Sequence, residues 1–330
     1  MFAGQGAQYP GMGKSLYESS NAAKNVFDGA GKQIIEWCFD GTKEILRQTQ
    51  VTQPCVYTAT MAAYEAFLEA ALFCGAGFFE SLKISGVAGF SLGEYAALTA
   101  AGVIEKKEHG LEIVTKRGEF MQKAGTGENG EPKGGMIAAF GDRAEILRCV
   151  GRARGGGILE GVNFNHKAQT VVAGDKDALL RFKEKAAEKR IKTIPLSVST
   201  AFHSPMMEEA SEALKEVLLK AGLKAPVYKI YCNLTGDDML SGFTLPGSEI
   251  TEYVADIMAR QAKSPIYWQE TIENMIRDGI DVFIEIGPGT TLSGFVRKAS
   301  HDVAVLNVDD KESLELTMKA LTDMLKGKGE

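Results

Sequence analysis

Cysteine is scarce in this chain of 330 residues, and no two cysteines form a Cys-x-x-Cys pair. The five residues are Cys38, Cys55, Cys74, Cys149 and Cys232, which are dispersed along the chain and odd in number. This pattern excludes a complete disulfide framework and favours reduced thiols. It also lacks the spacing of a zinc site, so we expect no bound metal. Reduced thiols are typical of a cytoplasmic protein.

Long apolar runs and blocks of like charge are missing as well. No apolar stretch approaches the roughly 20 residues that a membrane-spanning helix needs. The amino terminus has no basic segment followed by a hydrophobic one. A formal net charge of −6 argues against a nucleic-acid-binding surface. With 45% hydrophobic residues the chain can build a substantial core. We expect a cytoplasmic protein that binds neither membrane nor nucleic acid, and a monomer, although the sequence does not fix the oligomeric state.

What the chain does have is a Gly-x-Ser-x-Gly sequence, Gly89-Phe90-Ser91-Leu92-Gly93. Glycines two residues either side of a serine allow a sharp strand-to-helix turn that exposes the serine hydroxyl at a helix N-terminus. Backbone N–H groups and the helix dipole can stabilise an oxyanion there. A short motif of this kind also occurs in ordinary loops. The apolar run before it and the helix-forming run Glu94–Leu98 after it favour Ser91 as a nucleophile.

The order of the predicted elements divides the chain into two units. Residues 1–124 and 198–330 alternate helices with short buried strands, which is typical of an α/β fold with a parallel sheet. A polar, glycine-rich linker at residues 125–132 opens the segment 125–197, which follows the order β-α-β-β-α-β. We therefore expect a large α/β domain interrupted by a smaller ferredoxin-like subdomain.

Hydrophobic periodicity gives the expected elements. The predicted strands are Met136–Phe140, Ile158–Asn165, Thr170–Ala173 and Lys192–Leu196 in the small unit, and Val87–Phe90, Lys229–Cys232, Val282–Ile286 and Val303–Val308 in the large one. The predicted helices include one that Pro54 starts at its first position, Leu111–Lys123, Arg143–Val150, Lys176–Lys189, Glu249–Ala262, Trp268–Arg277 and a last helix that ends near Leu325. Helical spacing puts Arg117 and Met121 on one face.

A serine nucleophile needs a base within hydrogen-bond reach, and the chain has four histidines. His109 lies in a charged stretch and His301 in a polar turn, whereas His166 follows a predicted strand, where it could line a cleft or cap a turn. His203 follows directly where the small unit rejoins the large one. By elimination His203 is the expected base, and the alternative is a buried structural histidine. Because no aspartate is suitably placed, we expect a backbone or amide carbonyl to orient it.

These residues resemble those of the malonyl-CoA:acyl carrier protein transacylases and the related acyltransferase domains of polyketide synthases. The likeness extends along nearly the whole chain. It rests on Gly4–Gln8, Gly89–Tyr95, Arg117-Gly118 with Met121-Gln122, Asn163–Asn165, Ala201–Pro205, Gln261 within Arg260–Pro265, and Glu285–Gly289. The resemblance implies that the large domain is α/β-hydrolase-like.

The resemblance also implies a ping-pong acyl transfer by a serine–histidine dyad. Ser91 would attack a thioester, and His203 would accept its proton and return it to the departing thiolate. The backbone N–H groups that form the family's oxyanion hole fall at Gln5 and Leu92, and the carbonyl that orients its histidine falls at Gln261. The acyl group would pass from coenzyme A to the phosphopantetheine thiol of an acyl carrier protein, in fatty-acid biosynthesis and without a cofactor.

Four further positions are expected to bind the substrate. Arg117 would pair bidentately with the free carboxylate of a malonyl group, which a lysine would not reproduce. Without the resemblance, a lone arginine on a helix is most often a surface residue. Met121 and Asn163 fall at substrate-binding positions of the family. Phe202 resembles the form found in malonyl-using relatives, although packing where the two units meet explains a phenylalanine equally well.

The chain departs from the family pattern near the nucleophile and at its start. Phe90 stands where many relatives carry histidine, which leaves its effect on acyl selectivity open. Only Met1-Phe2-Ala3 precede the Gly-Gln-Gly motif, so the first strand is expected to be very short or cut off.

Other functions remain open at this stage. They are a trans-acting acyltransferase of a polyketide synthase, a serine hydrolase or thioesterase, and a non-catalytic scaffold. Lys185, Lys189, Arg190 and Lys192 are candidates for carrier docking, and solvated helix residues are the alternative.

Overall fold

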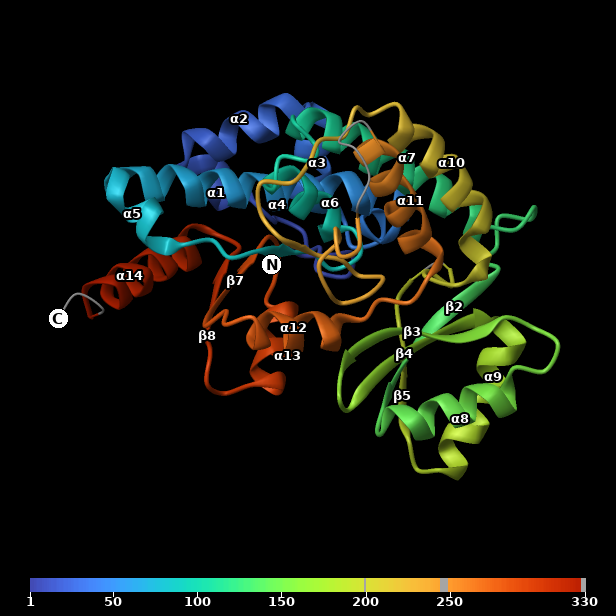
Figure 1. The fold of residues 1–330 in the computed structure, drawn as a ribbon. Coiled ribbons are helices and arrows are strands. Elements are labelled where there is room, and N and C mark those ends of the chain that lie inside the picture. The colour runs from blue at the N-terminus through green and yellow to red at the C-terminus, as the bar shows by residue number, and fades with distance from the viewer. Residues whose placement is uncertain (199, 244–248, 328–330) are drawn as a thin grey trace.

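The computed structural model describes residues 1–198, 200–243 and 249–327. Figure 1 shows a larger group of elements, made by both ends of the chain, beside a smaller group made by its middle. The helices that precede the middle segment are α1 (Lys14–Ser19), α2 (Asn21–Ala30), α3 (Lys32–Asp40), α4 (Thr49–Phe73), α5 (Ala76–Leu82), α6 (Gly93–Ala100) and α7 (Lys107–Gly125), with the short 3-10 helix η1 (Ile45–Arg47). Those that follow it are η2 (Pro205–Met207), α10 (Glu208–Leu219), α11 (Ile250–Lys263), α12 (Trp268–Arg277), α13 (Thr291–Ala299) and α14 (Lys311–Gly327).

Short parallel strands form the centre of the larger group. Strand β1 (Val87–Ala88) pairs with β6 (Ile230–Tyr231), and β7 (Val282–Ile286) pairs with β8 (Ala304–Val308). Phe2 joins the two pairs because it bridges Gly89 on one side and Ile286 on the other, both in parallel. The expected first strand is therefore reduced to one bridging residue. The resulting order, β6-β1-Phe2-β7-β8, brings the carboxyl ends of β1 and β6 to the same edge.

Helix α4 lies at the core of the larger group. Most of its residues are apolar or small and buried, and it packs against α2 and α7. The prediction that Pro54 starts this helix is wrong, since α4 begins at Thr49. The first turn forms on the carbonyl of Gln48, which accepts N–H bonds from Val51 and Thr52. Pro54 lies one turn further along, where it removes its own N–H bond and crowds the carbonyl of Gln50, and the packing of this buried helix outweighs that cost. No helix in the described ranges is both long and apolar enough to cross a membrane.

The middle segment forms an antiparallel sheet covered by two helices. Its elements are β2 (Gly134–Phe140), α8 (Arg143–Ala153), β3 (Leu159–His166), β4 (Gln169–Asp175), α9 (Lys176–Glu188) and β5 (Lys192–Pro195), with the strand order β3-β4-β2-β5. All six predicted elements are present, with shifted ends. The side chains of Asp142 and Asp175 accept N–H bonds at the starts of α8 and α9, so these aspartates cap helices.

Both faces of this small sheet are buried. Ile137 of β2 belongs with Phe182 to the apolar cluster under α8 and α9. The next residue, Ala138, points to the opposite face and packs in a cluster with Met121 and Phe202 of the larger group. The sheet therefore rests directly on the segment that carries His203.

A backbone link reinforces this contact. The N–H of Phe164 in β3 donates to the carbonyl of Ile266 (2.9 Å), and the N–H of Ile266 donates to the carbonyl of Val162 (2.8 Å). The segment after α11 thus adds to the β3 edge of the small sheet.

The turn after β1 leaves no room for a side chain at Gly93. A Cβ there would overlap the carbonyl oxygens of Phe2 and Ala3. We expect Gly93→Ala to lower the melting temperature by many degrees, because the clash is with backbone that joins two strand pairs. The matched control is Gly151→Ala in α8, where a Cβ meets no atom within 4 Å. This change should leave the melting temperature equal or slightly higher, since alanine favours helix by up to about 1 kcal/mol. Equal melting temperatures for the two variants would contradict the prediction.

Candidate active site

Ser91 lies in a strained turn between β1 and α6. Its φ is 52°, a left-handed conformation that is rare outside glycine. Gly89 permits the turn, because a Cβ there would overlap the backbone of Gly93. The predicted strand Val87–Phe90 is shorter than expected for this reason, since the chain leaves the sheet at Gly89. The turn presents the Ser91 hydroxyl at the carboxyl end of the sheet.

Ser91 and His203 form a hydrogen-bonded pair. The Ser91 Oγ lies 2.8 Å from His203 Nε2, and His203 Nδ1 lies 2.9 Å from the backbone carbonyl oxygen of Gln261. A carbonyl only accepts, so Nδ1 carries a proton and Nε2 offers its lone pair to the Ser91 hydroxyl. Both side chains are buried. The predicted nucleophile, base and orienting carbonyl are therefore in contact.

The surroundings of His203 keep its imidazole neutral. Burial lowers its pKa to about 3, and the positive charge of Arg117 adds to this effect. The bond to the Gln261 carbonyl acts in the opposite direction. A neutral imidazole at physiological pH can accept a proton, as a general base must.

Arg117 is a buried cation whose partners are all neutral. Its Nη1 donates to Gln53 Oε1 (2.9 Å), and its Nη2 donates to Gln261 Oε1 and to Ser91 Oγ (both 3.2 Å). The guanidinium carbon lies 5.3 Å from the centre of the Tyr95 ring. Burial lowers the pKa of Arg117. A desolvated charge that bonds to no carboxylate within the described residues is costly, so this site favours an anionic ligand beside the nucleophile.

The backbone of Ser91 is clamped by two side chains. Its N–H donates to Asn233 Oδ1 (2.7 Å), and Asn233 Nδ2 donates to the Gly89 carbonyl (2.7 Å), so one amide spans the turn. The Ser91 carbonyl accepts from Gln261 Nε2 (2.7 Å). These three bonds hold the serine in its left-handed conformation.

Glu94 orients both clamping residues. Its carboxylate accepts from the backbone N–H of Asn233 and from Gln261 Nε2, each at 3.0 Å. The side chain is completely buried, and burial raises its pKa to about 8. Glu94, Asn233 and Gln261 thus form one network beneath the nucleophile.

The predicted oxyanion donors lie at this turn. Within the described residues, no hydrogen bond uses the backbone N–H of Gln5 or of Leu92. Gln5 is held close by Gln53, whose Nε2 lies 3.5 Å from Gln5 Oε1. A Cβ at the preceding residue, Gly4, would overlap the carbonyl of Phe90, so the two segments are pressed together.

The remaining predicted substrate positions lie around the small sheet. The sulfur of Met121 is 3.5 Å from Gln53 Nε2, which places it beside Arg117. Phe202 packs in the same apolar cluster as Met121. Asn163 is buried on β3, and its Oδ1 has no hydrogen-bond partner within the described residues. No described hydrogen bond joins Asn163 to the dyad, so its predicted role stays a prediction.

Phe90 points away from the dyad. Its ring packs edge-on against Trp268 (5.3 Å between centroids) and lies 6.4 Å from the ring of Phe295. It therefore completes an apolar cluster of α12 and α13.

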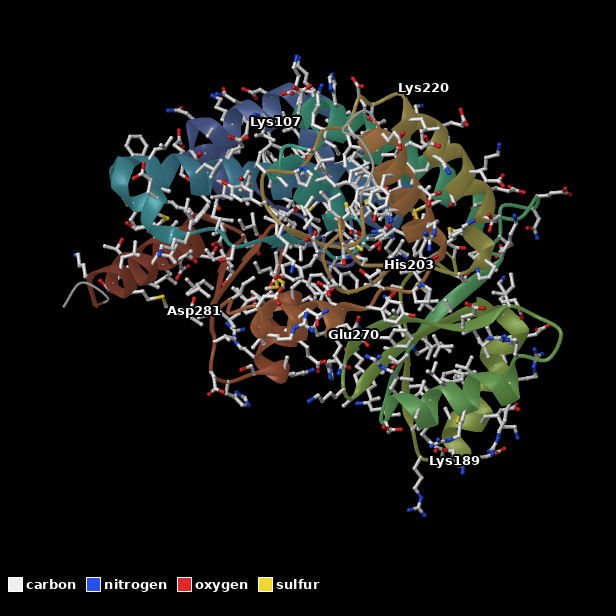
Figure 2. All side chains as sticks on the ribbon, viewed as in Figure 1. Lys107, Lys189, His203, Lys220, Glu270 and Asp281 are labelled. Atoms are coloured by element: carbon white, nitrogen blue, oxygen red, sulfur yellow. The ribbon has the colours of Figure 1, made fainter. Side chains whose placement is uncertain are left out.

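The basic residues predicted for docking lie at the far end of the small group. Figure 2 shows Lys189 at the edge opposite His203, which lies where the two groups meet. Lys185 pairs with Glu188 (2.7 Å) and Lys189 with Glu145 (3.6 Å). These pairs favour the alternative of solvated helix residues.

Sequence reasoning missed Gln53, Glu94 and Asn233. Two of them carried a signal: Glu94 is a charged residue in an otherwise apolar helix start, and Asn233 follows a strand at the carboxyl edge where ligands bind in parallel sheets. Gln53 carried none, because its role depends on the path of α4. No group of three histidine, cysteine or acidic residues in the described part of the chain could hold a metal ion.

Comparison with known proteins shows the family to which the chain belongs. Residues 1–328 match the family described as acyl transferase domain. The malonyl CoA-acyl carrier protein transacylase of Bacillus subtilis is 36% identical over 331 residues, which cover 98% of this chain and 96% of the relative. Its counterpart in Escherichia coli is 31% identical and covers 90% of this chain and 91% of the relative.

Solved structures agree with the sequence relatives. The malonyl CoA-acyl carrier protein transacylase of Clostridium perfringens has a TM-score of 0.86 and 34% identity, covering 100% of this chain and 98% of that chain. A malonyl-transacylase solved in complex with its type II PKS acyl-carrier protein has a TM-score of 0.83 and 30% identity, with 97% and 98% covered.

The low pKa of His203 predicts that the rate of reaction at Ser91 depends little on pH in the mildly acidic range. An imidazole of ordinary pKa, about 6.5, is about nine-tenths protonated at pH 5.5. With a pKa of about 3, His203 stays neutral there. We expect the rate of Ser91 labelling by a fluorophosphonate to change less than about twofold between pH 7 and pH 5.5.

Far-UV circular dichroism at each pH is the control for unfolding. The folded state excludes a proton that His203 takes up on unfolding, so its contribution to stability falls as pH drops below about 6.5 towards 3. A tenfold loss of labelling with an unchanged spectrum would show that the base has an ordinary pKa.

Asn233 does not contact the Ser91 hydroxyl, yet its hydrogen bonds to the backbone around Ser91 predict that its loss slows reaction at that hydroxyl. Asn233→Ala should slow Ser91 labelling about 10- to 100-fold, because the strained turn loses two hydrogen bonds and the hydroxyl moves. Asn233→Asp keeps the acceptor for the Ser91 N–H and should fall between. The control is Asn274→Ala, which loses a hydrogen bond from its side-chain Nδ2 to the carbonyl of Gly236 (2.9 Å), away from the turn at Ser91. If all three variants stay folded in a thermal melt and label at one rate, the clamp has no such effect.

Proposed function

Because the chain belongs to the family of acyl transferase domains, we propose that it moves a malonyl group from coenzyme A to the phosphopantetheine thiol of an acyl carrier protein, for fatty-acid biosynthesis. The observation that carries this proposal is the buried charge of Arg117, which has only neutral partners and touches the Ser91 hydroxyl. The names of the relatives agree with it. Coenzyme A and phosphopantetheine enter as carriers of the substrate, and the reaction needs no other cofactor.

The proposed chemistry is a ping-pong transfer through an acyl-enzyme on Ser91. The Ser91 hydroxyl gives its proton to His203 Nε2 as its oxygen attacks the thioester carbonyl. The N–H groups of Gln5 and Leu92 stabilise the resulting oxyanion, and loss of such a donor typically costs about 100- to 1000-fold in rate. His203 then protonates the departing thiolate. In the second half the carrier thiol gives its proton to His203, and its sulfur attacks the malonyl ester on Ser91. The bond between the acyl carbon and Ser91 Oγ then breaks, and His203 returns the proton to this oxygen.

Arg117 gives the site its preference for malonyl. A guanidinium has five N–H donors, and three of them bond Gln53, Gln261 and Ser91, so donors remain for a carboxylate. An acetyl group would leave the buried charge unpaired. The carboxylate would also neutralise the charge that helps to lower the pKa of His203. Malonyl binding therefore makes His203 a stronger base at the moment it is needed.

The proposal extends to the architecture of the protein. We assign residues 1–124 and 198–330 to an α/β-hydrolase-like catalytic domain, supported by the turn at Ser91 on a parallel sheet. We assign residues 125–197 to a ferredoxin-like subdomain, supported by the order β3-β4-β2-β5. A monomer in the cytoplasm is part of the same proposal, and the five cysteines, all free, agree with a reducing compartment.

A trans-acting acyltransferase for polyketide synthesis is the second candidate. The relative solved with a type II PKS carrier favours it. The two candidates share every step above and differ only in the carrier, so rates with carriers of each pathway distinguish them.

Intact mass spectrometry tests the proposal. The protein is incubated with malonyl-CoA, acetyl-CoA or methylmalonyl-CoA, alongside Ser91→Ala and Arg117→Ala. We expect a malonyl adduct that Ser91→Ala abolishes. With Arg117→Ala, the preference for malonyl over acetyl should fall at least tenfold, since a charge-assisted pair is lost.

Thermal melts confirm that each variant is folded. Free malonate without an adduct would indicate a hydrolase instead. Absence of both adduct and turnover in the unaltered protein would refute the transferase.

A further inference from the structure

Two basic side chains meet outside the dyad, where β3 ends beside α13. The Nζ of Lys298 in α13 lies 3.2 Å from Nε2 of His166, the last residue of β3. Lys298 is exposed and His166 is partly buried. Within the described residues, no ion pair joins Lys298 to a carboxylate. The nearby Glu273 pairs with Lys167 at 4.0 Å.

The two ring nitrogens of His166 face more hydrogen-bond donors than a neutral imidazole can accept. Its Nδ1 accepts the backbone N–H of Ala168 at 3.2 Å, so this nitrogen holds a lone pair. A neutral ring carries one N–H, so His166 cannot accept from both the Ala168 N–H and the Lys298 ammonium. Burial and the charge of Lys298 lower the pKa of His166, and Gln169 raises it to a smaller extent. The Lys298 ammonium and a ring N–H of His166 therefore lie close together, and an anion with several acceptor oxygens would accept hydrogen bonds from both.

The pair is connected to the nucleophile by a row of aromatic rings. The His166 ring lies 5.9 Å from that of Phe295, and Phe295 lies 6.4 Å from Phe90, the neighbour of Ser91. Strand β3 packs against both α12 and α13, which lie beside the small sheet in Figure 1. The pair thus lies next to α13 at a rim where Lys298 is exposed, two ring contacts away from Phe90, which precedes Ser91 in the chain.

We propose that Lys298 and His166 bind the phosphate at the end of the pantetheine arm. This inference rests on the proposed function, in which both substrates carry that arm. Ammonium and imidazole N–H groups form charge-assisted bonds with phosphate oxygens, which are stronger than neutral ones. Coenzyme A and a loaded carrier present the same pantetheine phosphate, so one anchor serves both half-reactions. It sets how far the arm reaches towards Ser91.

Kinetics with and without the phosphate test the anchor. Malonyl-CoA is compared with malonyl-pantetheine, which has the same arm and thioester but lacks the phosphates and the nucleotide. In Lys298→Ala and in His166→Gln, the ratio of kcat/KM for malonyl-CoA to that for malonyl-pantetheine should fall about tenfold, as expected for one lost charged hydrogen bond. The control is Lys319→Ala, an exposed lysine of α14, which should leave the ratio unchanged. An unchanged ratio in the first two variants would overturn the proposal.

The second half-reaction gives an independent comparison. KM for the phosphopantetheine-bearing carrier should rise in the same two variants. An effect on coenzyme A alone would overturn a shared anchor.

A binding measurement separates this inference from the transferase itself. With only four histidines, the imidazole signals can be followed by NMR, and His166→Gln assigns the relevant one. Pantetheine 4′-phosphate should raise the pKa of His166, because a bound anion favours the charged ring, whereas pantetheine should not. Inorganic phosphate should act more weakly, since it lacks the arm. A response without malonyl transfer would refute the proposed function but keep the site. Transfer without a response would refute the site.

Discussion

The two ends of Gln261 hold the catalytic site together. Its backbone carbonyl accepts the Nδ1 proton of His203, while its side chain donates to the carbonyl of Ser91 and accepts from Arg117. One residue at the end of α11 therefore fixes the base, the strained turn of the nucleophile and the buried cation relative to one another. An aspartate in the place of this carbonyl would add a negative charge beside Arg117. A neutral acceptor orients the histidine and leaves that charge available.

The two buried ionisable side chains beneath the nucleophile are kept apart. Arg117 and Glu94 are both buried, yet each bonds to a different atom of the Gln261 amide rather than to the other. A direct ion pair would satisfy the guanidinium and remove its affinity for a ligand carboxylate. This separation leaves the Arg117 guanidinium available to bind an anion.

The sequence predicts most elements of the fold and the residues that carry its chemistry. The turn at Ser91 follows from local backbone demands, the base at His203 from elimination among four histidines, and the role of Arg117 from the resemblance alone. The start of α4 did not follow, because packing outweighs the usual position of proline at Pro54. Asn233 and Gln53 were not recognised, because each acts through a contact between segments distant in the chain. Amide side chains in such places look like any polar residue until the fold brings them together.

The backbone pairing of Ile266 with β3 has a mechanical consequence. Ile266 follows Gln261 by five residues, and its two hydrogen bonds to Val162 and Phe164 extend the small sheet with a piece of the larger group. A hinge motion that swung the sheet outwards would have to break these bonds or pull on the carbonyl that steers His203. Outward movement of the small sheet is thus coupled to the segment that orients His203. The position of the small sheet and the orientation of His203 are therefore linked through hydrogen bonds of the backbone between Gln261 and Ile266.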